Sequence, residues 1–146
     1  DVKTYIQSGN AVFRTAANPE SLASQVVAAI DDRCGFSPGV LILEIEAFRA
    51  IAAANPYKKA EATPAQLHVS FLAETPADPD MDTLESLRSP SESFELVDRA
   101  FYLHAPDGIG RSKLAARVEK ALGVEATGRN WRSVTKILEL ADSIIG

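Results

Sequence analysis

The chain has a single cysteine, Cys34, among its 146 residues. One cysteine cannot form a disulfide within the chain, which argues against the disulfide-stabilised small secreted domains and fits a reducing, cytoplasmic compartment. Cys34 falls at an apolar position of a predicted helix, where a buried thiol with a structural role is expected. The chain also begins without Met, on residues that already resemble a strand, so we expect the native N-terminus to be missing.

Long apolar runs are absent too. No stretch approaches the 18 or so consecutive apolar residues that a membrane-spanning helix needs, so the sequence argues against membrane insertion. With 46% hydrophobic and 24% charged residues, the composition is that of a soluble globular protein. The length suits one ordinary domain or two very small ones.

Histidine is scarce, and the residue clusters of common catalytic sites are missing. His68 and His104 lie on separate predicted strands, with no Cys or carboxylate at the spacing of zinc ligands, so we interpret both as structural. Ser112 and Lys113 are adjacent, so their side chains point in different directions on a helix, which argues against a catalytic pair. Nothing indicates a metal or a cofactor, and enzymatic activity stays an open question.

Positive charge is unevenly distributed. The chain has 15 Lys and Arg against 20 Asp and Glu, a net charge of −5. Residues 108–136 contain seven of the basic residues and two of the acidic ones, so this window carries +5 and the remainder −10. Such an asymmetry indicates an acidic partner or ligand.

The first part of the chain alternates strand and helix signals. β-branched and aromatic residues predict two strands within residues 2–15, separated by the polar turn 7–10. Apolar residues at four-residue spacing predict a helix from Pro19 to Cys34, stopped by Gly35. A continuous apolar run predicts a strand over 40–45, and a short helix follows over 46–54.

The second part repeats a similar order after a segment rich in Lys and Pro. The patterns predict a strand over 67–73, a helix after Asp78-Pro79, a hairpin of two strands across Asp98-Arg99, a helix from Ser112 to Gly123 and a last helix from about Arg129 to Ser143. Trp131 lies on the apolar stripe of the last helix and is predicted to be core.

We therefore predict an α+β fold with two ferredoxin-like halves in tandem. The first half would span residues 1–55 and lack its initial strand and helix, residues 56–65 would be a linker, and residues 66–146 would form the second half with the C-terminal helix. One mixed sheet spanning the whole chain is the alternative.

Four segments carry a resemblance to a known family: residues 5–10 (YIQSGN), 54–57 (ANPY), 102–114 (YLHAPDGIGRSKL) and 129–136 (RNWRSVTK). Together they resemble the bacterial domain of unknown function family 1697, over nearly the whole chain. The resemblance implies a soluble bacterial protein with tandem ferredoxin-like halves and a further strand, loop and helix at the start. It implies no particular activity. Asp98 stands where a glycine is common in that family.

The basic window suggests an anion site. Gly108-Ile109-Gly110 leads into Arg111, Ser112 and Lys113, and glycines that expose backbone N–H groups at a helix start attract anions. The spacing is not that of a Walker A motif, and a turn leading to an N-cap at Ser112 explains the same residues. Surface arginines paired with acidic residues are a further alternative.

Cations at a helix N-terminus are locally unfavourable, which a bound anion would reverse. We predict that two helix starts converge on a phosphate- or carboxylate-bearing ligand, with neutral donors added by the turn near the N-terminus. The predicted contacts are Arg111, Ser112, Lys113, Arg129, Asn130 and Arg132, with Gln7, Ser8 and Asn10 as additional polar contacts.

Three function classes remain open from the sequence: a module that binds a small anion, an enzyme acting on a phosphorylated metabolite, and a protein-interaction domain. Nucleic-acid binding is disfavoured by the overall acidity and by the absence of an RNP1 pattern. A ferredoxin-like sheet could still present aromatic residues for base stacking, namely Tyr5, Phe13, Phe71 and Tyr102.

Overall fold

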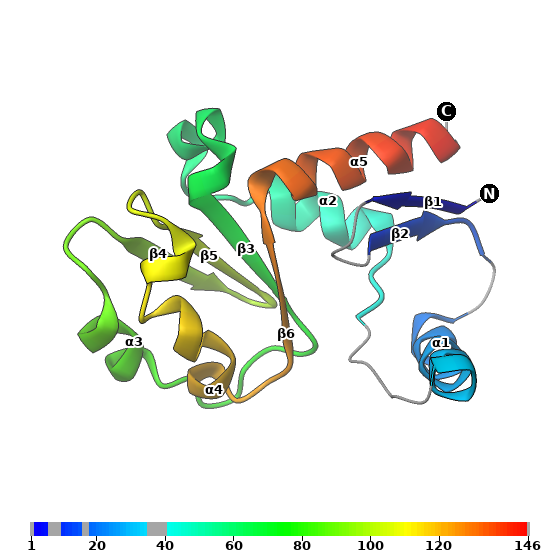
Figure 1. The fold of residues 1–146 in the computed structure, drawn as a ribbon, viewed down its shortest axis with the longest axis horizontal. Coiled ribbons are helices and arrows are strands. Elements are labelled where there is room, and N and C mark those ends of the chain that lie inside the picture. Colours follow the sequence, from blue (N-terminus) through cyan, green and yellow to red (C-terminus); the bar gives the residue numbers. More distant parts are fainter. Residues whose placement is uncertain (1, 6–9, 16–17, 35–40, 146) are drawn as a thin grey trace. The chain divides into compact units, whose positions relative to one another are not determined.

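The computed structural model describes residues 2–5, 10–15, 18–34 and 41–145 of the chain (Figure 1). These residues fall into two units. Unit 1 comprises Asp1–Ala53 and Lys136–Gly146, and unit 2 comprises Ala54–Thr135.

Unit 1 contains a two-stranded antiparallel sheet and helices. Strand β1 pairs with β2, with Val2 opposite Phe13. Arg49 of α2 donates a hydrogen bond to the carboxylate of Asp142 in α5, and this ion pair joins the two helices. The elements are β1 (Val2–Tyr5), β2 (Asn10–Phe13), α1 (Pro19–Cys34), α2 (Ile45–Ala53) and the part of α5 (Trp131–Ile145) that follows Thr135.

The predicted strands before residue 15 and the helix from Pro19 to Cys34 are confirmed. The strand predicted over 40–45 is wrong where the structure describes it, because residues 41–44 form neither strand nor helix and Ile45 begins α2. A short apolar run does not by itself identify a strand, because strand formation also requires a pairing partner, and residues 41–44 are half-buried or exposed. Gln7, Ser8, Gly35 and the side chain of Cys34 lie outside the described residues.

Unit 2 is built on a four-stranded antiparallel sheet with the order β4-β5-β3-β6. Along the chain its regular elements follow the order β3, α3, β4, β5, α4 and β6. Two 3₁₀ helices, η1 (Lys58–Ala62) and η2 (Pro64–Gln66), precede the sheet. The strands and helices are β3 (Leu67–Leu72), α3 (Met81–Leu87), β4 (Ser93–Val97), β5 (Ala100–His104), α4 (Val118–Leu122) and β6 (Ala126–Asn130).

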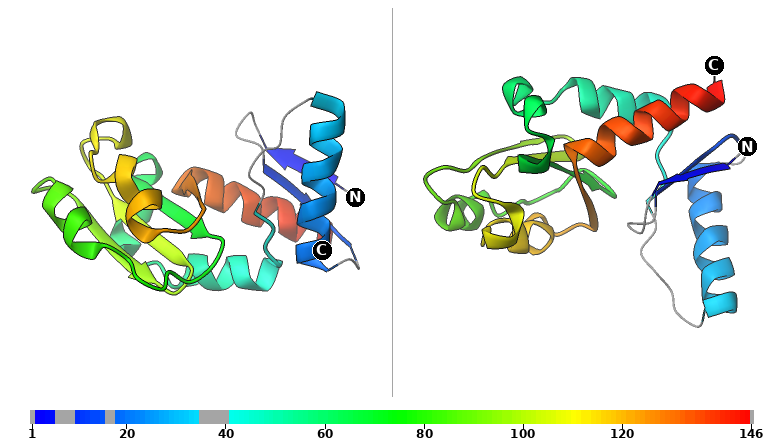
Figure 2. Two further views of the ribbon diagram at one scale, coloured as in Figure 1. Left: turned by 90° about the horizontal axis from the view of Figure 1, so that it is seen from below. Right: turned by 45° about the horizontal axis from the view of Figure 1, so that its top comes forward.

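The core of unit 2 lies between one face of this sheet and the helices α3 and α4, which occupy the same side of the sheet (Figure 2). Leu72 and Phe101 from the sheet pack with Leu84 of α3 and Leu122 of α4, and each is 2% exposed or less. Alternate residues of β3 are buried on the opposite face, including Val69. Both faces of the sheet therefore exclude water over much of their area.

The hairpin across residues 98–99 is confirmed: β4 pairs with β5 in antiparallel register, with Val97 opposite Ala100. Asp98 adopts a φ of 50°, in the left-handed region that favours glycine. The short polar side chain of Asp is among those that tolerate this region.

The last helix was predicted two residues too early. Residues 126–130 form strand β6, which pairs with β3, and α5 begins at Trp131. Arg129 is therefore a strand residue and not part of a helix start. The sequence Ala-Thr-Gly-Arg-Asn has little β-propensity, and its pairing with the buried strand β3 decides its structure. Trp131 is 6% exposed, as predicted for a core residue.

These elements confirm the α+β class, with a four-stranded antiparallel sheet. A single mixed sheet is wrong for the described residues, which form two separate sheets. Among the helices that the structure describes, none combines the length and apolar character needed to span a bilayer.

Candidate functional site

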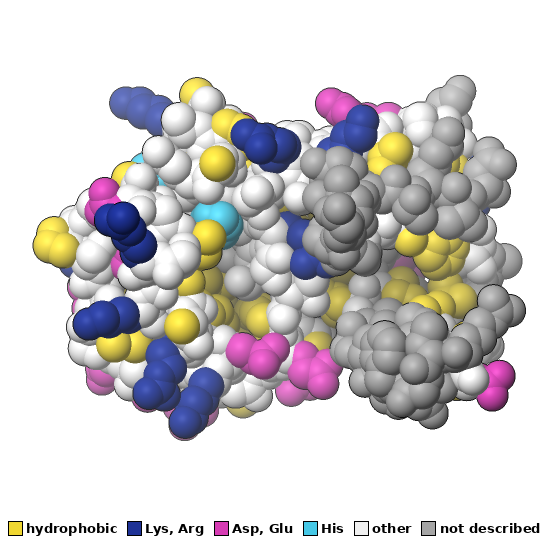
Figure 3. All heavy atoms as spheres, viewed as in Figure 1, with side chains coloured by type: hydrophobic (Ala, Val, Ile, Leu, Met, Phe, Trp, Pro, Cys, Tyr) yellow, Lys and Arg dark blue, Asp and Glu magenta, His cyan; other side chains and the backbone are white. Residues whose placement is uncertain are grey.

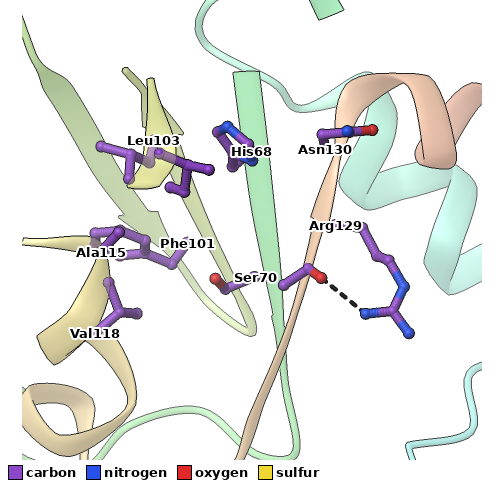
Figure 4. A pocket seen from close by; sticks show the side chains of 10 residues that line it. His68, Ser70, Phe101, Leu103, Ala115, Val118, Arg129 and Asn130 are labelled. Atoms are coloured by element: carbon purple, nitrogen blue, oxygen red, sulfur yellow. Dashed lines mark hydrogen bonds between the residues drawn. The ribbon is translucent and has the colours of Figure 1, made fainter. Parts of the chain in front are cut away.

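A pocket of about 330 Å³ opens on the α4 side of the sheet in unit 2 (Figure 4). Strands β3, β5 and β6 provide one wall, and residues between 109 and 118 provide the other. Its lining residues are His68, Ser70, Phe101, Leu103, Ile109, Ala115, Val118, Gly128, Arg129 and Asn130.

The strand register explains why polar groups gather there. Ser70 lies opposite Gly128 and His68 lies opposite Asn130, so all four belong to the sheet face that also carries Leu72. Along β3, this face changes from apolar Leu72 to Ser70 and then to His68. The short helix α4 packs on the apolar part, so the polar end of the sheet lines the pocket instead of the core.

His68 provides an unsatisfied polar atom. Its Nε2 is buried and has no hydrogen-bond partner among the described residues. Burial lowers the pKa of His68 below its usual value, and a hydrogen bond to the Ala65 backbone partly offsets this effect. Nε2 itself has almost no accessible surface, so it is a polar atom enclosed by the protein at the edge of the pocket.

Asn130 connects the pocket to the last helix. It ends β6, and its Oδ1 accepts a hydrogen bond from the backbone N–H of Ser133 at 3.0 Å. This is an N-cap interaction at the start of α5, which satisfies one of the free N–H groups of the first turn. The Oδ1 atom is thus engaged, while no described residue accepts a hydrogen bond from the Nδ2 of Asn130.

The glycine-rich motif does not open an α-helix. Ile109–Arg111 form a single 3₁₀ turn, Ala115–Arg117 form another, and α4 begins only at Val118. Ser112 is buried, and its Oγ accepts a hydrogen bond from the backbone N–H of Ala115 at 3.0 Å. Ser112 is therefore not a helix N-cap as predicted: it directly follows the 3₁₀ turn Ile109–Arg111, and the N-cap of the next turn is Leu114. The prediction of one continuous helix from Ser112 is wrong, because residues 109–111 and 115–117 each form a 3₁₀ turn.

The cations of the basic window are mostly exposed. Arg111, Lys113 and Arg132 form no ion pair with any residue that the structure describes, and all three side chains are exposed. Figure 3 shows Lys and Arg side chains on the surface of unit 2. Pairing with described surface acids therefore does not account for these three residues.

Arg129 differs from the other cations. Its guanidinium donates a hydrogen bond to the Gly128 carbonyl at 2.8 Å, and burial lowers the pKa of Arg129. As its neighbours on β6 face Ser70 and His68, the alternation of the strand turns the Arg129 side chain to the other face. In Figure 4 it extends away from Ser70 and Phe101. Arg129 thus borders the pocket on β6 without pointing its charge toward the histidine.

The structure brings only some of the predicted contacts to the pocket. Arg129 and Asn130 line it, whereas Arg111 and Lys113 lie between two lining residues, Ile109 and Ala115. Asn10 belongs to unit 1.

Sequence reasoning missed His68, Ser70 and Gly128 as pocket residues. The alternation of His68 and Ser70 in an apolar strand was the available signal, because it places two polar residues on one face. Gly128 carried no such signal without the pairing of β6.

The opposite face of the sheet offers little for base stacking. Phe71 is 4% exposed and Tyr102 is fully buried, so neither presents a ring to solvent. Burial, with a smaller contribution from the carboxylate of Glu95, raises the pKa of Tyr102 to about 12. The stacking alternative is therefore wrong for these two residues. Within the described part of the chain, no group of three or more His, Cys, Asp or Glu side chains could hold a metal ion.

A protein-family model described as Protein of unknown function (DUF1697) matches residues 1–102. The chain belongs to this family. A search of curated proteins and a search of solved structures each found no match.

The family match covers only some of the residues that line the pocket. His68, Ser70 and Phe101 lie within the matched residues, whereas Gly128 and Asn130 lie beyond them, as does the whole basic window. The match thus covers the β3 part of the pocket and Phe101, whereas the other lining residues follow it in the chain.

Proposed function

We propose that this DUF1697 protein binds a small organic anion in the pocket of unit 2. The observation that carries the proposal is a pocket lined by both apolar and polar side chains, among them His68, whose buried Nε2 has no hydrogen-bond partner among the described residues. Ligand pockets in proteins typically combine apolar walls with a few polar groups, and 330 Å³ is within the range for small molecules.

The apolar side of the ligand would pack against Phe101, Leu103 and Val118. Ile109, which also lines the pocket, supports this assignment. It is 40% exposed, and no other large hydrophobic residue that the structure describes is exposed. A ligand in the pocket would cover this surface and gain the free energy of apolar burial.

The anionic group would be held by the cations next to the pocket. Arg111 and Lys113 lie between two lining residues, and Arg132 lies two residues after Asn130 in the first turn of α5. The free N–H groups of that turn add a positive partial charge. In this proposal Ser112 and Asn130 hold the local backbone, while Arg129 is a secondary contact because its guanidinium already bonds the Gly128 carbonyl. Contributions from Gln7, Ser8 and Asn10 stay predictions.

We also propose that the chain consists of two ferredoxin-like halves in tandem, joined by a linker at residues 56–65. The order β3-α3-β4-β5-α4-β6 supports a ferredoxin-like second half. For the first half, and for the boundary at residues 56–65, the support is the sequence pattern. A cytoplasmic location is supported by the single cysteine.

A thermal-shift screen tests the binding proposal. The probes are inorganic phosphate, glycerol 3-phosphate, malate, succinate and AMP, each added to the full chain. A probe present at a hundred times its dissociation constant should stabilise the protein by roughly 2.7 kcal/mol. The double variant Arg111→Ala/Lys113→Ala should lose most of this effect, because both substitutions remove cations without altering the pocket lining.

Gly128→Val provides a blocking variant with a matched control. A Cβ at position 128 would lie 3.7 Å from Ser70 Oγ, an ordinary contact, so the larger side chain enters the pocket without strain on the backbone. Thr127→Val is the control, since Thr127 is on the same strand but lies opposite Phe71, on the other face. If a probe binds Gly128→Val as tightly as wild type, the assignment of the pocket is wrong. If no probe binds the wild-type protein, the assignment is also wrong.

A further inference from the structure

Strands β4 and β6 are the two edges of the sheet in unit 2 (Figure 1). An edge strand presents unpaired backbone N–H and C=O groups, to which another chain can add a strand unless they are covered. On β6, two side chains cover such groups. The Glu119 carboxylate accepts a hydrogen bond from the Ala126 N–H at 2.9 Å, and Arg129 donates one to the Gly128 carbonyl at 2.8 Å. A strand that paired with β6 would have to break these bonds.

On β4, the outward backbone groups belong to Phe94 and Leu96. The Leu72 N–H donates to the Arg99 carbonyl, which shows that odd-numbered residues around β5 face β3 and even-numbered ones face β4. The even-numbered residues of β5 lie opposite odd-numbered residues of β4, so Phe94 and Leu96 direct their N–H and C=O groups away from the sheet. No described residue forms a hydrogen bond with these groups.

Glu95 gives this open edge its charge. It is exposed between Phe94 and Leu96, and its carboxylate forms no ion pair with any residue that the structure describes. Arg99, on the same hairpin, is engaged by the backbone carbonyls of residues 72 and 73. The side chains of Phe94 and Leu96 pack at the border of the core on the other face. The edge thus combines free backbone groups, two half-buried apolar side chains and an uncompensated negative charge.

Pairing with a second copy of the chain is disfavoured at this edge. The antiparallel pairing that uses all the outward groups of both strands places Phe94 opposite Leu96 of the other copy, and Glu95 opposite its own equivalent. Like charges directly opposite one another destabilise a strand pair. A basic residue at that position would pair with Glu95 instead, and apolar residues on either side of it would extend the rows of Phe94 and Leu96.

We propose that β4 is a docking edge for an extended segment of a partner protein, in which a Lys or Arg lies opposite Glu95 with an apolar residue on each side. The segment would bond the outward groups of Phe94 and Leu96 and add a strand to the sheet. In this mode of recognition, backbone hydrogen bonds give affinity and alternate side chains give specificity. None of the described β4 residues lines the pocket, so the docking edge and the anion pocket can be tested separately.

Three capped peptides test the docking edge in the full chain. The first has a Val-Lys-Val centre flanked by threonines, and the second has Val-Glu-Val in the same frame. Isothermal titration should show the Lys peptide binding about fivefold more tightly, because an opposite-charge pair replaces a like-charge pair across from Glu95. The third peptide is the Lys peptide with both valines N-methylated, which removes the N–H groups that would bond β4. It should lose binding.

Backbone amide exchange measured by NMR locates the bound peptide. The N–H groups of Phe94 and Leu96 have no partner among the described residues, so their exchange with solvent should slow when the Lys peptide binds. Glu95 and Val97 are the matched control, because their N–H groups already face β5 and should change little. If the Lys peptide does not bind, or binds without slowing exchange at Phe94 and Leu96, the docking edge is wrong.

Glu95→Lys tests the charge rule. The residue is exposed, so the variant should fold, and it should prefer the Glu peptide by a similar factor. Glu125→Lys is the matched control, since it makes the same charge change at an exposed residue just before β6 and should keep the preference for the Lys peptide. Equal binding of the Lys and Glu peptides by wild type would overturn the basic partner. Protection of the Phe94 and Leu96 amides that grows with protein concentration, without peptide, would identify a second copy as the occupant and overturn the proposal.

Discussion

The Oδ1 of Asn130 accepts the backbone N–H of Ser133 at 3.0 Å, so one residue both ends strand β6 and caps helix α5. The same residue lines the pocket opposite His68. Asn130 therefore contributes both to the stability of the protein and to the lining of the pocket. Different substitutions of Asn130 can test these two roles separately.

Asn130→Ala should destabilise the protein by about 1 kcal/mol, because it removes the N-cap of α5. Asn130→Ser should retain most of that free energy, since serine is also a favourable N-cap residue. Urea denaturation of both variants and wild type measures the difference. Equal losses for Ala and Ser would show that the cap contributes nothing and that another contact of Asn130 matters.

Trp131→Ala should lower the free energy of unfolding by roughly 3–5 kcal/mol, because the indole is 6% exposed and its removal leaves a large cavity. The neighbouring exposed residue supplies the control: Arg132→Ala should change stability by about 0.5 kcal/mol or less. Both values come from the same denaturant titration. A loss below about 1 kcal/mol for Trp131→Ala would be inconsistent with a core anchor.

Asp98 is expected to tolerate glycine better than a β-branched residue. Its φ of 50° lies where L-residues with bulky side chains are strained, so Asp98→Val should cost about 1–2 kcal/mol. Asp98→Gly relieves the strain, offset by the greater freedom of glycine in the unfolded chain, and should be close to neutral. Thermal unfolding of the two variants checks the order. A Val variant as stable as the Gly variant would argue against left-handed backbone at this turn.

Elements with strong local patterns were predictable from the sequence. The spacing of apolar residues in α1 and the alternation in β3 each identify one structure, and the buried positions Val118 and Leu122 of α4 follow from the helical period. The hairpin at Asp98 was also predicted, despite its missing glycine.

Elements defined by distant pairing were not predictable. Strand β6 has a glycine and two small residues in its five positions, and only its ladder with β3 makes it a strand. The pocket depends on that ladder, since it brings Gly128 and Asn130 beside Ser70 and His68. From the sequence alone, His68 is therefore interpreted as an ordinary strand histidine, and the arginines are the stronger signal of a site. Charge and apolar periodicity can be read from a short stretch of sequence, whereas the pocket depends on how β6 is aligned with β3.

The pH dependence of stability should report the environment of His68. Burial lowers the pKa of this imidazole below 6.5, so the unfolded chain takes up the proton at a higher pH than the native protein. Protonation then favours the unfolded state, and the free energy of unfolding decreases as the pH falls from above 6.5 toward the native pKa. Above this window both states carry neutral imidazole, so His68 no longer makes the free energy of unfolding depend on pH.

His68→Gln removes this titration. The stability of wild type relative to His68→Gln should therefore be greatest near pH 8 and decrease on acidification, as measured by urea denaturation at a series of pH values. Ser70→Ala is the matched control, because Ser70 lines the same pocket but does not titrate, so its difference from wild type should stay constant with pH. A difference for His68→Gln that is also constant, or that grows as the pH falls, would mean that the native environment does not disfavour the imidazolium. In that case burial would not set the pKa of His68, and a favourable interaction such as the hydrogen bond to the Ala65 backbone would balance or outweigh it.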